Sequence, residues 1–383
     1  MGLSLARTVE LLERIAPLAY AEDWDNVGLL LEPLGDRRAQ GEPPSIRRAL
    51  VTIDLTEAVL EEALAQDVDL VVAYHPPVFR PLKRLGTRGS AERALQRLAR
   101  AGTAIYSPHT ALDAAPGGVN DWLAAGAGPG EITPLVEANA LDPAAAFKLV
   151  TFVPAEQVDA VASALSGAGA GVIGEYRECS SRTPAVGTFL GGPATDPAVG
   201  QRGKLEHVDE IRLEMVCPKH ALGRAARVLR DVHPYEEPAW DVYPLAARPA
   251  AGFGQGRGVT LETPVPLETL VRRLKTHLGR ASLRVAATEA QRGGAVVRRV
   301  AVCAGSGAGV FERAPGFDAY VTGELSHHAV LATLGSGASI VLAEHSTTER
   351  GYLPEYAQRL QDLAEGALEV VVAQRDREPL EQW

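Results

Sequence analysis

Residues 68–79 read VDLVVAYHPPVF, and in this stretch an apolar run ends directly in a histidine and two prolines. A short apolar run bounded by turn residues is typical of a strand buried on both faces of a sheet. The sequence therefore predicts a strand at Val68–Tyr74, with His75 at its carboxyl end. Sheets of α/β proteins bind ligands at the carboxyl ends of their strands, so His75 is the first candidate site residue.

Strands and helices alternate on both sides of this stretch. We expect neighbouring strands at Ala49–Ile53 and Thr103–Ser107, and helices at Glu57–Ala65 and Ala91–Ala101. The pattern returns near the C-terminus, where the expected strands are Val296–Cys303, Ala319–Val321, Ser339–Ala343 and Leu368–Val372 and the expected helices are Ser326–Leu334 and Leu353–Ala364. Both ends of the chain are therefore predicted to form an α/β core with a parallel or mixed sheet.

The middle of the chain follows a different order. Phe152–Leu165 and Val216–Leu229 each join a strand end to an amphipathic helix, and strand candidates follow at Val172–Cys179 and Ala239–Leu245. The resulting β-α-β-β-α-β order is typical of a ferredoxin-like fold. We therefore predict a first core part at residues 1–146, an inserted ferredoxin-like α+β domain at 147–246, and a second core part at 247–383. The Ala-rich stretch Asp142–Ala146 forms the first border.

Composition limits the classes of function. The 383 residues are 46% hydrophobic and 22% charged, which is typical of a packed globular protein. A formal net charge of −10 disfavours duplex nucleic acid as a partner, because phosphate binding needs a basic face. Three widely separated cysteines fit a reducing compartment, and no apolar run approaches the ~20 residues of a membrane span. The first helix is amphipathic and unlike a signal peptide, so we expect a cytoplasmic protein without a membrane partner.

Three further clusters of polar residues follow predicted strands. They are SPHTALD at 107–113, TGELSHH at 322–328 and EHSTTERG at 344–351. His109 and Asp113 are four residues apart, and so are His345 and Glu349. Four residues make about one helical turn, so each pair can point the same way from a helix. Because each cluster lies where a strand ends, we expect them to converge on one rim of the sheet.

These residue types favour a metal site. Neutral imidazole and ionised carboxylate are the ligands of Zn, Fe, Mn or Ni in a mixed nitrogen and oxygen site. A carboxylate has two oxygens and can bridge two ions, and two ions about 3.5–4 Å apart can share one water and lower its pKa. A single histidine after a strand is more often a hydrogen-bonded structural residue. Several such clusters in one chain make that alternative weaker.

Five motifs in a fixed order resemble one known family. WDNVGLLLE (24–32), YHPPVF (74–79), HTALDAAPGGVND (109–121), TGELSHH and HSTTERG (345–351) resemble the GTP cyclohydrolase 1 type 2 homologue family, also called NIF-three-like dinuclear-metal proteins. The resemblance covers residues 1–125 and 296–383. The middle segment, which ends in HPYEEPAWDVYPL (233–245), resembles the PII/CutA-like domain inserted in longer members.

The resemblance implies a ligand set for two divalent metal ions. The implied ligands are His75, His109, Asp113, His345 and Glu349, with Asp113 and Glu349 as candidates for bridging. Many family members have two adjacent histidines where this chain has Tyr74 and His75. A tyrosine is a poor ligand unless it is deprotonated. One of the two metal positions is therefore either weaker or dependent on His328.

Other polar residues carry smaller predictions. Glu324 is the candidate catalytic residue, as a general base or as an acceptor that supports a ligand; the alternative is an ordinary carboxylate at a helix start. Asp25 and Asn26 either line the pocket or form a turn. AGSGAG (304–309) is interpreted as a tight turn near the metal rim, because it lacks the last glycine of a dinucleotide fingerprint. The histidines interpreted as structural are His207, His220, His233, His277 and His327.

The leading functional hypothesis is a metal-dependent hydrolase. The family name implies the GTP cyclohydrolase 1 type 2 kind of reaction, with GTP, another nucleotide or a related small molecule as substrate. The alternative is a non-catalytic metal-binding or regulatory protein whose inserted domain senses a ligand. In both cases the resemblance implies a homohexamer.

Overall fold

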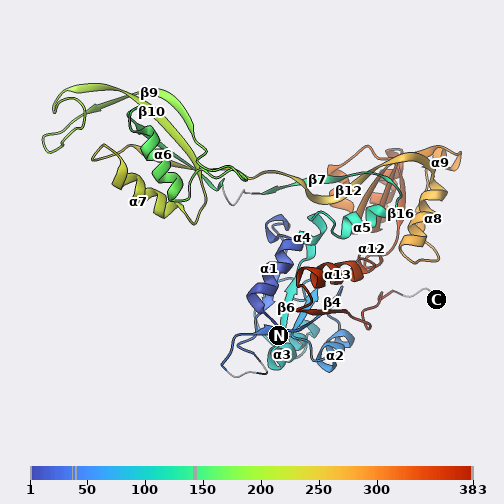
Figure 1. Cartoon of the computed structure of the whole chain (residues 1–383). Coiled ribbons are helices and arrows are strands. Elements are labelled where there is room, and N and C mark those ends of the chain that lie inside the picture. The colour runs from blue at the N-terminus through green and yellow to red at the C-terminus, as the bar shows by residue number, and fades with distance from the viewer. Residues whose placement is uncertain (1, 37, 39–40, 141–144, 381–383) are drawn as a thin grey trace. The chain divides into compact units, whose positions relative to one another are not determined.

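The computed structural model describes residues 2–36, 38, 41–140 and 145–380, and the chain divides into two compact units. One unit joins residues 1–138 to residues 250–383, and the other, which we call the middle unit, comprises residues 139–249 (Figure 1). Residues 141–144 lie outside the described residues, so most of the predicted border Asp142–Ala146 does too.

The unit built from both chain ends contains a five-stranded sheet in the order β17-β4-β5-β6-β2. These strands are β17 (Glu369–Val372), β4 (Arg48–Thr52), β5 (Leu70–Ala73), β6 (Ala104–Ser107) and β2 (Gly28–Leu31). The first four are parallel, and β2 runs antiparallel to β6. The C-terminal β17 thus completes a sheet that the N-terminal part begins. A two-stranded sheet of β1 (Leu3–Ser4) and β3 (Ser45–Ile46) lies apart from it.

Helices cover both faces of this sheet because its strands are apolar on both faces. Val51 and Val72 belong to one hydrophobic cluster, and Leu50 and Val71 belong to another. This alternation follows from successive side chains of a strand pointing to opposite faces. Helices α1 (Leu5–Ile15) and α13 (Leu353–Leu363) contribute to the first cluster, and α2 (Glu57–Ala65) and α3 (Ser90–Ala101) to the second.

A second, six-stranded sheet follows the order β13-β16-β15-β14-β12-β7. The strands are β13 (Arg284–Ala286), β16 (Ser339–Leu342), β15 (Ala319–Glu324), β14 (Val296–Ser306), β12 (Arg248–Pro266) and β7 (Gly130–Ala140). Strands β14, β15 and β16 are parallel, β12 runs antiparallel to β14, and β13 runs antiparallel to β16. The associated helices are α5 (Val119–Ala125), α8 (Leu267–His277), α9 (Glu289–Arg292), α10 (Ala308–Arg313) and α11 (His327–Gly335).

The two sheets share one hydrophobic core. Val51 and Val72 of the first sheet fall in the same cluster as Val300 and Val321 of the second. The chain is therefore a mixed α/β protein, as predicted, but the prediction of a single sheet rim was wrong. The strand ends that carry the polar clusters belong to two sheets.

The middle unit has the order β8 (Phe147–Val153), α6 (Val158–Gly167), β9 (Ser181–Leu190), β10 (Leu205–Cys217), α7 (Leu222–Val232) and β11 (Trp240–Pro244). Its antiparallel sheet has the strand order β11-β8-β10-β9. Leu165 of α6 and Leu229 of α7 pack with Leu149 and Leu213 of the sheet in one cluster.

The predicted strand at Val172–Cys179 was wrong. That segment contains only an isolated bridge between Ile173 and Tyr176, and the strand begins at Ser181. Gly171 and Gly174 have φ values of +73° and +55°, which belong to a turn and not to a strand. The apolar residues of the segment therefore close a turn before β9.

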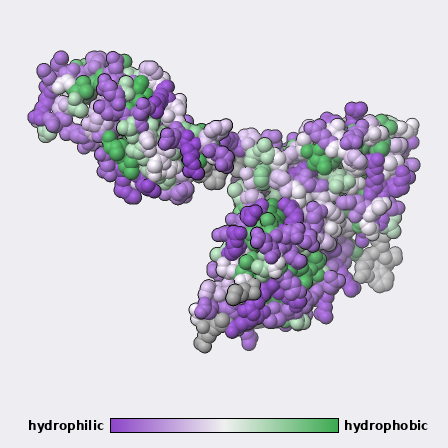
Figure 2. Space-filling view, viewed as in Figure 1, coloured by the Kyte–Doolittle hydropathy of each residue, from purple (hydrophilic) through white to green (hydrophobic). Residues whose placement is uncertain are grey.

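Hydrophilic residues predominate on the face shown in Figure 2, and hydrophobic residues appear among them in scattered groups. Among the helices that the structure describes, none is both long and apolar enough to cross a bilayer.

Candidate metal centre

His75 lies directly beyond β5, and its imidazole is held by the end of the neighbouring strand. Its backbone N–H donates to Ile53 O at 3.0 Å, which continues the strand pairing past Ala73. Asp54 follows that same residue, and its Oδ1 accepts from His75 Nδ1 at 3.0 Å. Burial alone would lower the pKa of His75, but its contacts with Asp54 and Glu349 outweigh burial and raise the pKa to about 10.

His109 is held in the same way by Asp25. It begins α4 (His109–Ala114) with a φ of +26°, an uncommon backbone conformation for a residue with a side chain. Its Nδ1 donates to Asp25 Oδ1 at 2.8 Å, and Thr110 donates to Asp25 Oδ2 through both its backbone N–H and its hydroxyl. Burial raises the pKa of Asp25, but the hydrogen bonds from His109 and Thr110 lower it below its usual value overall.

His345 follows β16, and its support comes from the adjacent strand β15. Its Nδ1 donates to Glu324 Oε1 at 3.1 Å. Glu324 is the last residue of β15, so it is not the helix-start carboxylate of the alternative interpretation. The preceding Glu344 has a φ of +67°, so the backbone turns sharply where the imidazole leaves the strand.

The three imidazoles share one arrangement: a carboxylate accepts from each Nδ1. A carboxylate at one ring nitrogen fixes the tautomer and directs the other nitrogen toward a metal, which is the usual arrangement of metal-bound histidines. The ring centroids of His75 and His345 are 5.3 Å apart, and those of His75 and His109 are 5.4 Å apart. The Nε2 atoms are thus left for a shared ligand.

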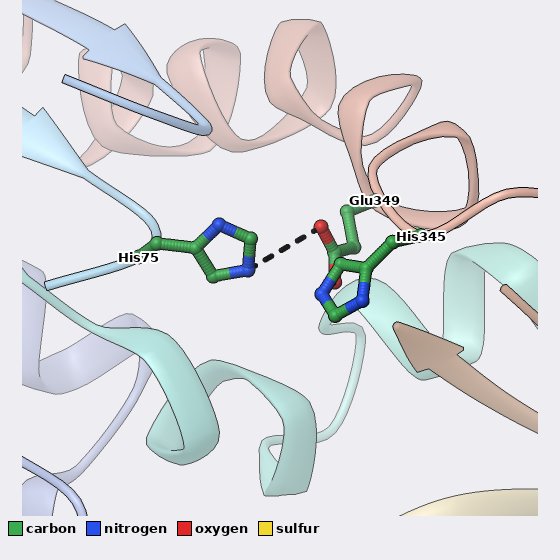
Figure 3. Close-up of side chains that lie close together, drawn as sticks. All are labelled: His75, His345 and Glu349. Carbon is green, nitrogen blue, oxygen red and sulfur yellow. Dashed lines mark ion pairs between the residues drawn. The ribbon is translucent and has the colours of Figure 1, made fainter. Parts of the chain in front are cut away.

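Glu349 lies between two of these imidazoles. It belongs to α12 (Thr347–Arg350) and is 2% exposed. Its Oε1 lies 3.3 Å from His345 Nε2, and its Oε2 lies 3.6 Å from His75 Nε2 (Figure 3). Two ligands of one ion, each about 2.0–2.2 Å from it, are separated by about 3–4 Å. Among the described residues, His75, His345 and Glu349 form a group that could hold a metal ion, with ligand atoms within 4.8 Å of one another.

Glu349 also has a buried oxygen atom that lacks a hydrogen bond. No described residue donates a hydrogen bond to its Oε2. A buried carboxylate oxygen without a donor is costly, and a bound cation would remove that cost. The donor set of imidazole nitrogens and carboxylate oxygens suits a borderline divalent ion.

Asp113 lines the same cavity as Glu349. It is one helical turn beyond His109 on α4, and its Oδ1 accepts from the hydroxyl of Tyr74. Burial is the main reason that the pKa of Asp113 rises to about 6, and the nearby charge of Glu349 adds to it. Burial also raises the pKa of Tyr74 well above its usual value. The phenol therefore stays protonated and serves as a donor to Asp113.

Gly305 gives the carboxylate and the imidazole their space. Its φ is +64°, and a Cβ there would lie 2.6 Å from Glu349 Oε1 and 3.0 Å from His345 Nε2. The predicted tight turn was wrong for Ala304–Ser306, which belong to β14, where its pairing with β15 shifts register. Thr348 fixes the backbone there, because the Thr348 hydroxyl accepts from Gly305 N–H and donates to His345 O. The AGSGAG stretch thus lies against the group that could hold a metal.

The five predicted ligands line one cavity of about 730 Å³. Glu324 and Asp25 each accept a hydrogen bond from a histidine that lines the cavity, His345 and His109 respectively. The side chain of Asn26 donates to Val78 O. His328 is not among the described residues that line the cavity; its ring contacts His327, with centroids 5.6 Å apart.

Asp54 is the supporting residue that the sequence interpretation missed. The available signal was its position directly after the predicted strand Ala49–Ile53, beside the strand that precedes His75. Two of the histidines interpreted as structural have local partners: His233 Nε2 lies 3.0 Å from Phe152 O, and the ring of His277 packs on Trp122 with centroids 4.5 Å apart.

Comparisons with known proteins show which family the chain is similar to. Residues 3–379 match the family model described as Duf34/NIF3 (NGG1p interacting factor 3). A Bos taurus relative named NIF3-like protein 1 is 35% identical over 381 residues, which cover 99% of this chain and 92% of the relative. A Bacillus subtilis (strain 168) relative named GTP cyclohydrolase 1 type 2 homolog is 35% identical over 342 residues, which cover 88% and 87%.

Solved structures show the same fold. A Bacillus cereus protein related to NIF3 aligns with a TM-score of 0.70 and 28% identity over 100% of both chains. A Staphylococcus aureus protein aligns with a TM-score of 0.77 and 24% identity over 100% of this chain and 99% of its own.

Proposed function

Because the chain belongs to the Duf34/NIF3 (NGG1p interacting factor 3) family, we propose that its His/Asp/Glu group holds two divalent metal ions and that the protein is a metal-dependent hydrolase. The observation that carries the proposal is that the carboxylate-supported imidazoles of His75 and His345 face the two oxygens of Glu349. The carboxylate-supported imidazole of His109 lies beside that of His75. An N–H that donates to a carboxylate leaves the opposite nitrogen available as a ligand.

We propose two ions because the two oxygens of Glu349 face different imidazoles. Oε1 faces the imidazole of His345 and Oε2 faces that of His75, so each oxygen has its own partner. Glu349 would then be a ligand of both proposed ions. His109 and Asp113, one helical turn apart on α4, supply the remaining nitrogen and oxygen ligands.

The proposed ions are Zn, Fe, Mn or Ni, since all four accept nitrogen and oxygen ligands. A pair of such ions lowers the pKa of a water and stabilises negative charge that develops on a substrate. The protein itself has three tasks. Asp54, Asp25 and Glu324 orient the imidazoles, and Tyr74 holds Asp113 by donating to it. Gly305 keeps the space beside Glu349 open.

Glu324 has two separable roles in this proposal, which are orienting His345 and accepting a proton from the reacting water. Its side chain is 55% exposed, so it is accessible to solvent. The variant Glu324→Gln separates the two roles, because the amide oxygen still accepts from His345 Nδ1 but cannot take up a proton near neutral pH. If Glu324 is the general base, this variant keeps its metal and loses turnover. Full turnover in the variant would restrict Glu324 to positioning.

We propose a ferredoxin-like, PII/CutA-like identity for the middle unit, with the domain at residues 147–246 between core parts 1–146 and 247–383. Its β-α-β-β-α-β order and its antiparallel sheet support this. By resemblance we further propose a cytoplasmic homohexamer. The substrate is GTP, another nucleotide or a related small molecule, and the net charge of −10 disfavours nucleic acid.

Turnover is the test of this function. Protein of defined metal content is offered GTP and a panel of other nucleotides, and product formation is followed by chromatography. We expect metal-dependent turnover in the wild type and its loss in His345→Ala. The exposed His220 of the middle unit offers the control His220→Ala, which should retain turnover. Absence of metal-dependent turnover across the panel would favour the second candidate, a non-catalytic metal-binding or regulatory protein with a ligand-sensing middle unit.

A further inference from the structure

Two aromatic side chains stand exposed at the metal cavity. Trp24 is 59% exposed and Phe79 is 45% exposed, and both line the cavity that contains the proposed ligands. Their ring centroids are 5.9 Å apart and their planes meet at 58°. Exposed apolar side chains are common singly, but a pair that lines the same cavity as the proposed metal ligands marks a surface suited to a ligand.

This aromatic pair adjoins the metal group directly. The ring of His109 is 6.1 Å from that of Trp24 and 6.5 Å from that of Phe79, with near-perpendicular planes in both cases. A planar molecule that stacks on Trp24 or Phe79 would therefore lie beside a proposed metal ligand. Stacking on aromatic side chains is the common means by which proteins hold bases without reading their sequence.

The pair is held in place by its chain neighbours and not by burial of the rings. Asp25, next to Trp24, is fixed by its hydrogen bonds with His109 and Thr110. Val78, next to Phe79, accepts a hydrogen bond from the side chain of Asn26. The two segments are thus tied to each other and to α4. Such pre-organisation lowers the entropic cost of binding a ligand.

One guanidinium group lines the same cavity. Arg313, at the end of α10, is the only Lys or Arg among the described lining residues. Its Nε donates to Gly309 O, and its Nη2 lies 3.9 Å from Glu22 Oε1, a distance too long for a strong ion pair. Its terminal nitrogens remain accessible to an anionic group, which guanidinium binds well.

We propose that Trp24 and Phe79 form a stacking platform for a planar heteroaromatic ring and that Arg313 binds an anionic group of the same molecule. This inference rests on the proposal that the metal cavity is the active site, and it assigns the substrate class from the cavity wall: an anionic heteroaromatic compound, such as a mononucleotide. Trp24, Phe79 and Arg313 are then the residues that determine specificity.

Binding to metal-free protein tests this inference without relying on catalysis. After chelation, the protein is titrated by calorimetry with GMP and CMP, with guanosine as the ring alone and with ribose 5-phosphate as the anion alone. We expect both nucleotides to bind, and Trp24→Leu and Phe79→Leu each to weaken them about tenfold or more. Arg313→Gln should weaken the nucleotides but leave guanosine unchanged.

Exposed residues away from the cavity provide matched controls. Tyr176→Leu removes an aromatic ring that is 76% exposed in the middle unit, and Arg292→Gln removes a guanidinium that is 61% exposed. Both should bind GMP as the wild type does. Failure of GMP and CMP to bind, or wild-type affinity in Trp24→Leu and Phe79→Leu, would overturn the inference.

The outcomes also separate this inference from the proposed hydrolase. Nucleotide binding that depends on Trp24 and Phe79, without turnover in any metal state, would support the platform and overturn the hydrolase. Metal-dependent turnover with unchanged nucleotide affinity in Trp24→Leu and Phe79→Leu would support the hydrolase and overturn the platform.

Discussion

At the scale of single residues, the three carboxylates behind the imidazoles separate a metal site from a chance cluster of histidines. Asp54, Asp25 and Glu324 each accept from an Nδ1 and each come from a different segment of the chain. Histidines with merely structural roles need not all have a carboxylate acceptor at Nδ1. The predictions at this scale concern the supporting residues, since changing a ligand does not test its support.

Removing Asp54 should weaken metal binding although Asp54 touches no ion. In Asp54→Ala, His75 loses the acceptor that orients its ring, and loss of such a partner usually costs 10–100-fold in affinity, an order-of-magnitude expectation. Competition with a chromophoric chelator measures the change. Asp23→Ala removes an exposed carboxylate from another segment and serves as the control. Equal affinities in the two variants would show that Asp54 has no supporting role.

Adding one methyl group at Gly305 should disturb the site directly. A Cβ there would lie 2.6 Å from Glu349 Oε1, and the φ of +64° disfavours any side chain. We expect Gly305→Ala to lose about 1–3 kcal/mol of stability and to bind metal more weakly, as measured by denaturant unfolding and metal titration. A Cβ at Gly309 meets nothing within 4 Å and Gly309 lies in helix α10, so Gly309→Ala should lower neither stability nor metal affinity. If the two variants behave alike, the close approach is unimportant.

At the scale of elements, Asn120 of α5 joins the two halves of the site. It is 1% exposed, its Nδ2 donates to Asp113 O at 3.0 Å, and its Oδ1 accepts from Ala304 N–H at 2.8 Å. One side chain therefore connects the end of α4 to the C-terminal end of β14. No strand pairing links these two elements.

Replacing Asn120 by Ala should leave two buried backbone groups without partners. An unsatisfied buried polar group costs about 1–3 kcal/mol, so we expect Asn120→Ala to lower the free energy of unfolding by about 2–4 kcal/mol. Denaturant unfolding measures this loss, and a metal titration should show weaker binding as well. An unchanged unfolding free energy would mean that the link is dispensable.

The elements themselves were well predicted where patterns were local. Helix α2 has the predicted bounds Glu57–Ala65, because Thr56 caps its first turn and the apolar spacing marks its face. Strand β15 runs past the predicted Val321 to Glu324. That extension changes Glu324 from a residue near a helix start to the end of a strand, beside His345. Local sequence patterns do not show where a strand ends, because the last paired residue depends on the neighbouring strand.

The candidate site residues could also be predicted from local patterns, but the hydrogen-bond partners of these residues could not. His75, His109 and His345 each follow an apolar run, so their place at strand ends could be inferred. Their partners could not, because the hydrogen bonds from His75 to Asp54 and from His109 to Asp25 depend on which strand ends become neighbours. The role of Tyr74 as a donor to Asp113 likewise required the fold.

At the scale of the whole molecule, the site depends on a core made from both ends of the chain. Two sheets contribute to one hydrophobic cluster, and β17 from the C-terminus completes the sheet of the N-terminal part. The expectation of one sheet rim was wrong because the sequence shows strands but not how they are divided between sheets. The chain leaves the unit that contains this core after residue 138, forms the middle unit, and returns at residue 250.

Anomalous diffraction from crystals grown with metal locates each ion and identifies its element. We expect two ions per chain, both in contact with Glu349, with metal–nitrogen distances of about 2.0–2.1 Å to the Nε2 atoms of the histidines. An ion elsewhere in the chain with none beside Glu349, or ordered metal-free side chains in the geometry described here at saturating metal, would contradict this expectation.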